Sequence, residues 1–290
     1  MTWSVALRLG RVSNLPTIWT NTLAGVVLAG QQTWRPGLLV LLLALSLFYI
    51  AGMYLNDAFD RNIDARERPE RPIPAGQVGV ATVFATGLVM MAAGLALLLW
   101  LGHGLAGGTG WRPFLSGLTL GAAILVYDWR HKDNPLSPFL MGLCRMLVYV
   151  TAGFAVVAQP PGMLFLAALI LLGYLIGVTS IAKQENLGQV KNLWPLLFLA
   201  APAVYGLSAA GQSVISAVLL GGFVAWTLFA LNFLRRRRAG DIPRAVVSLL
   251  AGISLVDGLF IAGMGAAGLA FLALAGFSAT LLFQRFVPGT

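Results

Sequence analysis

Three aspartates with helical spacing are the residues of this chain best suited to bind a metal ion. Asp57, Asp60 and Asp64 are spaced i, i+3 and i+7, and Asn56 lies one turn before Asp60. A helix that continues through them places all four side chains on one narrow face. Carboxylates that lie so close repel one another, and a hard cation bound through oxygen relieves that repulsion. Mg²⁺ favours this chemistry, a few carboxylates together with substrate phosphates.

Arginines follow these acids directly. Arg66, Arg68 and Arg71 come within seven residues of Asp64, and guanidinium groups bind phosphate oxygens through paired hydrogen bonds. Acids and arginines together predict a Mg²⁺-diphosphate site. A charged loop that only sets membrane orientation is the plain alternative. We favour the site, because such a loop requires neither three helically spaced Asp nor two Arg-Pro pairs.

The composition around this stretch is that of a polytopic membrane protein. Of the 290 residues, 58% are hydrophobic and only 10% are charged, which excludes a soluble globular domain. Ten apolar runs approach the length that crosses a bilayer. They cover residues 12–30, 37–56, 79–101, 113–128, 138–158, 162–182, 193–210, 213–234, 244–263 and 265–285. No linker divides the chain, so we expect one membrane domain over residues 1–290.

The charges are distributed unevenly between the loops that join these spans. If the N-terminus is cytoplasmic, sixteen of the nineteen Lys and Arg lie on the cytoplasmic side, two lie outside and one lies within a span. This asymmetry is the positive-inside pattern. It explains the net charge of +9 without a nucleic-acid partner. We expect an integral protein of a bacterial inner (plasma) membrane with its N-terminus in the cytoplasm.

Four polar residues within the spans are further candidates. Arg145 lies about two turns into an apolar helix, where a charge is costly and usually faces a cavity or a partner; we favour a role in the site over a structural ion pair. Asp257 lies near mid-membrane, where it either binds an acceptor or forms a hydrogen bond to a neighbouring helix. Asn14 and Asn21 share one face of the first span and line the same cavity, although interhelical hydrogen bonding explains them equally well.

The acid-rich stretch also carries a family resemblance. The pattern is Asn56-Asp57-x-x-Asp60-x-x-x-Asp64 followed by Arg68-Pro69-x-Arg71-Pro72-Ile73-Pro74-x-Gly76. It closely resembles the first aspartate-rich motif of the UbiA superfamily of intramembrane prenyltransferases. The resemblance implies an all-α bundle of nine or ten transmembrane helices. It also implies an enzyme that binds an isoprenyl diphosphate through Mg²⁺ and transfers the prenyl group to an acceptor, usually an aromatic one.

Two other cytoplasmic loops correspond to family positions less closely. Tyr127 and Lys132, after the fourth span, loosely match a family tyrosine and basic residue near the diphosphate, and a solvated loop explains them as well. After the sixth span the family places a second aspartate-rich motif, but this chain has only Glu185 there, with Lys183 before it. Three explanations remain open: Lys183 replaces a cation, Glu185 holds a second metal with Asp128 or Asp133, or catalysis is lost.

The sequence therefore predicts a prenyltransferase that ionises a polyprenyl diphosphate at the cytoplasmic membrane face. Asp57, Asp60 and Asp64 would hold Mg²⁺ with Glu185, and Arg145 and Lys183 would assist catalysis. The substrate-binding residues would be Asn14, Asn21, Asn56, Arg68, Arg71, Tyr127 and Lys132. The acceptor is unknown and aromatic or lipid-like. A non-catalytic binding or transport protein with the same fold is the alternative, and a phosphatase that releases the prenyl alcohol is a third reading.

Overall fold

The regular secondary structure of the protein is helical throughout the residues that its computed structural model describes, which are 1–33, 35–132, 134–184, 192–211, 213–236, 238–287 and 289. The long helices are α2 (Leu15–Leu28), α3 (Gly37–Glu67), α4 (Val80–His103), α5 (Arg112–Arg130), α6 (Ser137–Val156), α7 (Gly162–Ala182), α9 (Val214–Arg236), α10 (Asp241–Gly263) and α11 (Ala267–Phe283). The short ones are α1 (Trp3–Leu9), η1 (Val12–Asn14), η3 (Trp194–Ala200) and α8 (Ala201–Ala210). The predicted all-α fold is confirmed.

Nine of the ten predicted apolar runs each coincide with one of the long helices, and the run 193–210 covers η3 and α8. Not every helix is long enough to cross a bilayer. Among the described residues, six helices are both long and apolar enough, namely α3, α4, α6, α7, α9 and α10. α2 has only 14 residues, and α11 has 17. The exact number of nine or ten spans therefore stays a prediction, while the integral membrane fold does not depend on it.

α3 is the longest helix of the described chain and carries the acid-rich stretch. It extends over 31 residues without interruption, because no proline or glycine follows Gly52 until Pro69. The loop expected at 57–78 is thus helical as far as Glu67, so the condition for placing the three aspartates on one face is met. The helix ends at Glu67, because the next residue, Arg68, precedes Pro69, whose ring disfavours a helical conformation in the residue before it.

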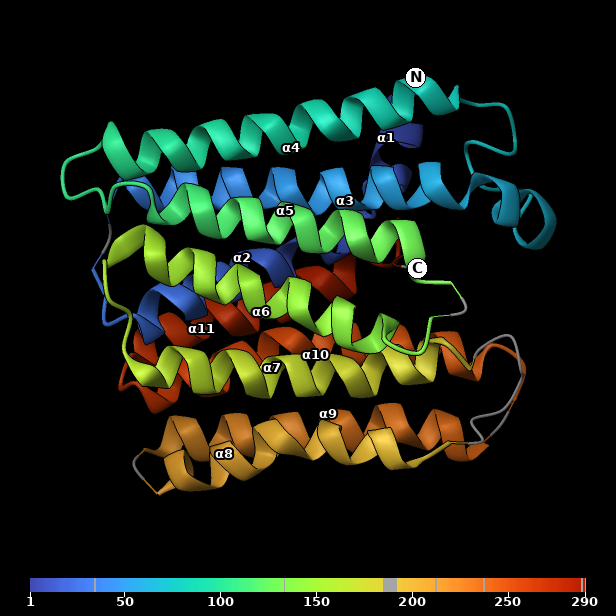
Figure 1. Cartoon of the computed structure of the whole chain (residues 1–290). Coiled ribbons are helices and arrows are strands. Elements are labelled where there is room, and N and C mark those ends of the chain that lie inside the picture. The colour runs from blue at the N-terminus through green and yellow to red at the C-terminus, as the bar shows by residue number, and fades with distance from the viewer. Residues whose placement is uncertain are drawn as a thin grey trace.

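The helices form a bundle whose polar loops gather at one end. Figure 1 shows the C-terminal ends of α3, α5, α7 and α9 at the same end of the bundle. α10 lies inside, with 83% of its most apolar window buried. Large apolar side chains such as Leu39, Val89 and Phe271 are exposed on outer helices, as expected where a helix faces lipid. The fold therefore brings the predicted cytoplasmic loops together.

α2 and α6 approach each other closely in the interior of the bundle. A Cβ atom on Gly25 would lie 2.8 Å from both the Tyr149 carbonyl oxygen and the Ala152 Cβ. Only glycine fits at such a crossing, as is common between helices in membranes. The approach brings Asn21, one turn before Gly25, against the buried face of α6.

Candidate functional site

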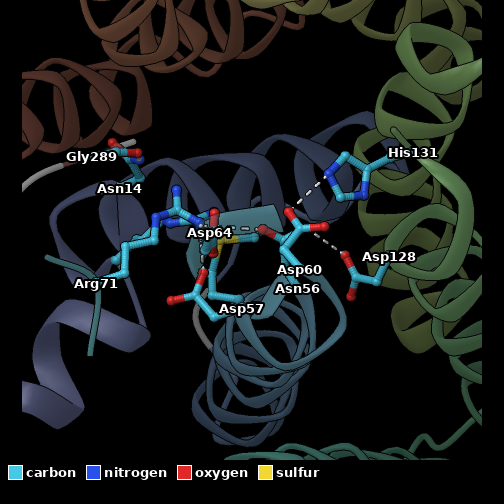
Figure 2. A network of polar contacts seen from close by, with 11 residues as sticks. Asn14, Asn56, Asp57, Asp60, Asp64, Arg71, Asp128, His131 and Gly289 are labelled. Carbon is cyan, nitrogen blue, oxygen red and sulfur yellow. Dashed lines mark hydrogen bonds and ion pairs between the residues drawn. The ribbon is translucent and has the colours of Figure 1, made fainter. Parts of the chain in front are cut away.

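The acids of α3 lie on its buried face. Asn56, Asp57, Asp60 and Asp64 are all at most 6% exposed, and Figure 2 shows them grouped on that side of the helix. Their burial follows from the i, i+3, i+7 spacing, which turns all of them toward the interior of the bundle. Buried carboxylates require positive partners or hydrogen-bond donors.

A cavity of about 570 Å³ opens beside this face. Its polar lining comes from the N-terminal segment, from α3 and the turn after it, and from the ends of α5, α6 and α7. This lining includes Arg11, Asn14, Asn56, Asp60, Arg66, Glu67, Arg68, Arg71, Tyr127, Asp128, His131, Lys132, Arg145 and Lys183. Its apolar lining includes Ile18, Phe48, Leu120, Ile124, Val148, Leu175 and Val178. The cavity thus has a polar end and an apolar remainder.

Two of the three aspartates are paired with arginines. The Arg71 Nη1 atom lies 2.8 Å from the Asp64 carboxylate and 3.4 Å from Asp57. Arg11 Nη2 donates to Asp57 Oδ1 at 2.7 Å and to Asn56 Oδ1 at 3.3 Å. Asp57 and Asp64 consequently contact guanidinium groups and do not line the cavity, whereas Asp60 does.

Arg11 is a site residue that sequence reasoning missed. Burial alone would lower the pKa of its guanidinium, but the Asp57 carboxylate and other neighbouring groups raise the pKa above its ordinary value. Arg11 therefore stays charged beside the acids. In the sequence it stood out only as one of the sixteen basic residues assigned to the cytoplasmic side.

A second group of side chains links α3 to the end of α5. His131 Nε2 lies 3.2 Å from Asp60 Oδ2, and the Asn56 side-chain amide donates to Asp128 Oδ1 at 3.2 Å; Figure 2 shows both contacts. The Tyr127 ring stacks on His131. Asp128 is buried and its Oδ2 atom has no hydrogen-bond partner. Tyr127, Asp128 and Lys132 were already candidates from the sequence, but the sequence did not reveal this contact with α3.

Two predicted basic residues complete the polar end of the cavity. Lys132 Nζ lies 3.9 Å from a Glu67 carboxylate oxygen, and Lys183 donates to the Asn134 carbonyl oxygen at 2.5 Å. Both line the cavity, as do the predicted Arg68, Arg71 and Tyr127. The structure thus brings the basic candidates of three separate loops around one space.

The deeper candidates divide into two sets. Asn14 lines the cavity, where it donates to the Gly289 carbonyl oxygen at 2.8 Å and accepts from Gln284 at 2.9 Å. Asn21 is fully buried and contacts Arg145 and Asp257 instead of lining the cavity. The expectation that both asparagines line one cavity is therefore wrong for Asn21. Glu185, a predicted metal ligand, and Asp133 lie outside the described residues.

The donor atoms at this end suit a hard cation only in part. Within the described ranges, no three His, Cys, Asp or Glu side chains are grouped closely enough to hold a metal ion by themselves. Asn56, Asp60 and Asp128 nevertheless offer oxygen atoms beside the cavity, and one carboxylate oxygen of Asp128 is buried without a partner. A set of few oxygen donors fits Mg²⁺ that shares its coordination with phosphate and water.

Comparison with known proteins identifies the family. Residues 18–187 match the UbiA prenyltransferase family. The chain belongs to this family. The digeranylgeranylglyceryl phosphate synthase of Methanopyrus kandleri is 29% identical over 275 residues, which cover 89% of this chain and 90% of that protein. The chloroplastic chlorophyll synthase of Arabidopsis thaliana is 28% identical over 232 residues, 74% of this chain and 57% of that protein.

Solved structures of UbiA homologues share the fold. A homologue from Archaeoglobus fulgidus, bound to GPP and Mg²⁺, superposes with a TM-score of 0.61 at 18% identity and covers 91% of this chain and 99% of its own. A homologue from Aeropyrum pernix K1 gives a TM-score of 0.61 at 16% identity, with 93% of this chain and 98% of its own covered. The superfamily resemblance of the aspartate-rich stretch is confirmed.

Proposed function

We propose that this protein transfers an isoprenyl group from a polyprenyl diphosphate to a lipid-like acceptor. The observation that carries this proposal is the single cavity in which the acid-bearing face of α3, a ring of basic side chains and an apolar wall meet. Only the diphosphate of such a donor is polar, and its tail is wholly apolar. The proposal is also supported by the Archaeoglobus fulgidus homologue, which binds GPP and Mg²⁺.

The polar end of the cavity would bind the diphosphate. Mg²⁺ would be held by Asp60, Asn56 and Asp128 beside the remaining aspartates, and would neutralise charge on the diphosphate oxygens. Arg68, Lys132 and Lys183 line the same end and add fixed positive charge. Lys183 would occupy the role that a second acidic motif with a second cation has elsewhere in the family.

The basic side chains would act most strongly as the allylic C–O bond breaks. Negative charge then grows on the departing diphosphate, so positive groups fixed beside it stabilise the transition state more than the bound substrate. The allylic cation that remains is destroyed by water. Apolar residues such as Phe48, Leu120 and Val178 would exclude water from it. The acceptor oxygen would attack the cation there and release its hydroxyl proton, while the diphosphate departs as the leaving group.

We also propose that this end of the bundle faces the cytoplasm, together with the N-terminus. The proposal is supported by the excess of Lys and Arg in the loops at that end. A lipid-like acceptor would then reach the cavity from the membrane. The Methanopyrus kandleri relative is named for making digeranylgeranylglyceryl phosphate, which makes a geranylgeranyl ether of glycerol phosphate the first acceptor to test.

A product assay tests the proposal. The purified protein in lipid nanodiscs would be given labelled geranylgeranyl diphosphate and Mg²⁺, with the mono-geranylgeranyl ether of glycerol phosphate, with chlorophyllide, or with no acceptor. We expect a labelled diether only in the first case. A labelled product with chlorophyllide would place the protein with the chlorophyll synthases. Labelled prenyl alcohol without acceptor would indicate a phosphatase, and binding without any product would favour the non-catalytic alternative.

A further inference from the structure

Asp257 is a fully buried acid that the proposed chemistry leaves unused. It lies in α10 with no exposed surface and accepts hydrogen bonds from side chains of two other helices. Thr20 Oγ1 donates at 2.5 Å, the Asn21 side-chain amide donates at 2.8 and 2.9 Å, and the Tyr149 hydroxyl also donates. A carboxylate surrounded by donors accepts all of these bonds best in its ionised form, which has acceptors only.

Asn21 connects this carboxylate to the wall of the cavity. Its Oδ1 atom accepts a hydrogen bond from Arg145 Nη1 at 2.9 Å, while its amide nitrogen donates to Asp257. Arg145 lines the cavity, and neither Asn21 nor Asp257 does. The amide therefore has a fixed direction: its NH₂ group faces the acid, and its oxygen faces the guanidinium.

The charges at the two ends of this connection are opposite. Arg145 is only 8% exposed, and a guanidinium at that depth requires a compensating anion or a polar partner. The Asp57 and Asp64 carboxylates contact Arg11 and Arg71 instead. A network that served only to hold α2, α6 and α10 together would need no cationic member in the cavity wall.

We propose that Asp257 is a positioning residue that acts through Asn21 to hold the Arg145 guanidinium at the cavity wall and to offset its charge. This inference rests on the proposed function, because it assigns Arg145 to the diphosphate end of the donor. Asp257 itself touches no substrate. Its effect is on the direction of the Asn21 amide and on the electrostatic cost of keeping Arg145 charged in the bundle.

Substitution by the isosteric amide tests the direction of the chain of hydrogen bonds. In Asp257→Asn, the new NH₂ group of residue 257 can face the NH₂ group of Asn21, and two donors then oppose each other. If the Asn21 amide rotates to avoid this, its NH₂ group faces the Arg145 guanidinium in place of its oxygen. The double substitution Asn21→Asp with Asp257→Asn restores one carboxylate, one amide and an acceptor toward Arg145. Asp241→Asn is the matched control, because Asp241 is a buried acid that pairs at 2.7 Å with Arg236, away from the cavity.

The readout is the dissociation constant of a non-ionising thiolodiphosphate analogue of geranylgeranyl diphosphate, measured on the intact protein in nanodiscs. We expect Asp257→Asn to weaken binding by about tenfold or more, since a charge-assisted hydrogen bond at the site is lost. We expect the double variant to recover most of it and Asp241→Asn to bind as wild type. Weak binding in the double variant, or unchanged binding in Asp257→Asn, would overturn the proposal.

A structure of the Asp257→Asn protein separates this inference from the proposed function. We expect the Arg145 guanidinium to have left Asn21, and to have returned to it in the double variant. If Arg145 keeps its contact with the side chain at position 21 in Asp257→Asn, the inference fails whatever the protein binds. If wild type does not bind the analogue while Arg145 moves as expected, the proposed function fails and the positioning role stands.

Discussion

The Arg71 guanidinium lies 2.8 Å from the Asp64 carboxylate, so residues predicted for two different ligands contact each other. Asp64 was expected to bind a cation, and Arg71 was expected to bind phosphate oxygens. Arg71 also reaches Asp57 at 3.4 Å. Repulsion among the acids of α3 is therefore relieved by arginines of the protein as well as by any cation that binds. Because their partners differ, we expect the acids of α3 to contribute differently to the stability of the protein and to its activity.

Asp57→Asn should lower both turnover and stability, whereas Asp60→Asn should lower chiefly turnover. Asp57 pairs with two guanidinium groups, those of Arg11 and Arg71. Loss of its carboxylate leaves part of their buried positive charge uncompensated. We expect a cost of about 2 kcal/mol for Asp57→Asn and less than about 1 kcal/mol for Asp60→Asn. Turnover should fall by about 100-fold or more in both variants.

Thermal unfolding in detergent, measured beside turnover in nanodiscs, checks this pair. Asp241→Asn serves as a control for the loss of a buried acid, because it should lower stability without lowering turnover. If Asp60→Asn unfolds as early as Asp57→Asn, the different partners of the two acids do not govern stability in the way the contacts indicate.

Asp128→Asn should lower turnover and Mg²⁺ affinity with little effect on the stability of the protein. The amide oxygen of the substituted side chain can still accept from Asn56, as Asp128 Oδ1 does at 3.2 Å. The unpartnered Oδ2 atom makes no hydrogen bond that the substitution could break, so stability should stay within about 1 kcal/mol of wild type. Turnover and apparent Mg²⁺ affinity should fall by about tenfold if this oxygen serves the cation. A Mg²⁺ titration of activity measures both, and unchanged Mg²⁺ affinity would remove Asp128 from the proposed cation site.

Lys183→Gln tests whether a lysine replaces the missing second acidic motif. Lys183 lines the polar end of the cavity, where its charge would stabilise the departing diphosphate. We expect kcat to fall by about 10–100-fold in Lys183→Gln and by less than about fivefold in Lys183→Arg, which keeps the charge. Steady-state kinetics on both variants decide the matter, and equal kcat in Lys183→Gln and wild type would refute the replacement.

Gly25→Ala should disturb the crossing of α2 and α6. The new Cβ would lie 2.8 Å from the Tyr149 carbonyl oxygen and the Ala152 Cβ, and relief of this overlap should cost about 1–3 kcal/mol. Gly221→Ala in α9 is the matched control, because a Cβ there meets nothing within 4 Å and should stabilise the helix by about 0.5–1 kcal/mol. Denaturation midpoints compare the two, and equal stability would mean that the α2–α6 contact yields without cost.

The parts of the site that lie on one helix could be predicted from the sequence. The face of Asn56, Asp57, Asp60 and Asp64 follows from the period of a helix, and the helix continues to Glu67 because nothing interrupts it. The basic residues of separate loops could be assigned to one end of the bundle from charge asymmetry alone. These inferences need only local geometry and membrane topology.

Contacts between helices distant in the sequence could not be predicted in this way. Arg11 lies 46 residues before Asp57, and Asn21 lies 124 residues before Arg145, so no spacing rule relates them. No spacing rule relates His131 to Asp60 either, yet the two side chains are in contact across helices. The close approach of α2 and α6 at Gly25 is what makes Asn21 part of the Arg145 network, and that approach depends on packing.

The most direct test of the central claim is diphosphate release from geranylgeranyl diphosphate by the purified protein. Wild type and Asp60→Asn would be compared with and without Mg²⁺ and with and without the glycerol-phosphate ether acceptor. We expect release only from wild type with both Mg²⁺ and acceptor, in equal amount to the prenylated product. Release that continues without Mg²⁺ or in Asp60→Asn, or no release from protein that still binds the diphosphate, would contradict the assignment of this site as a prenyltransferase centre.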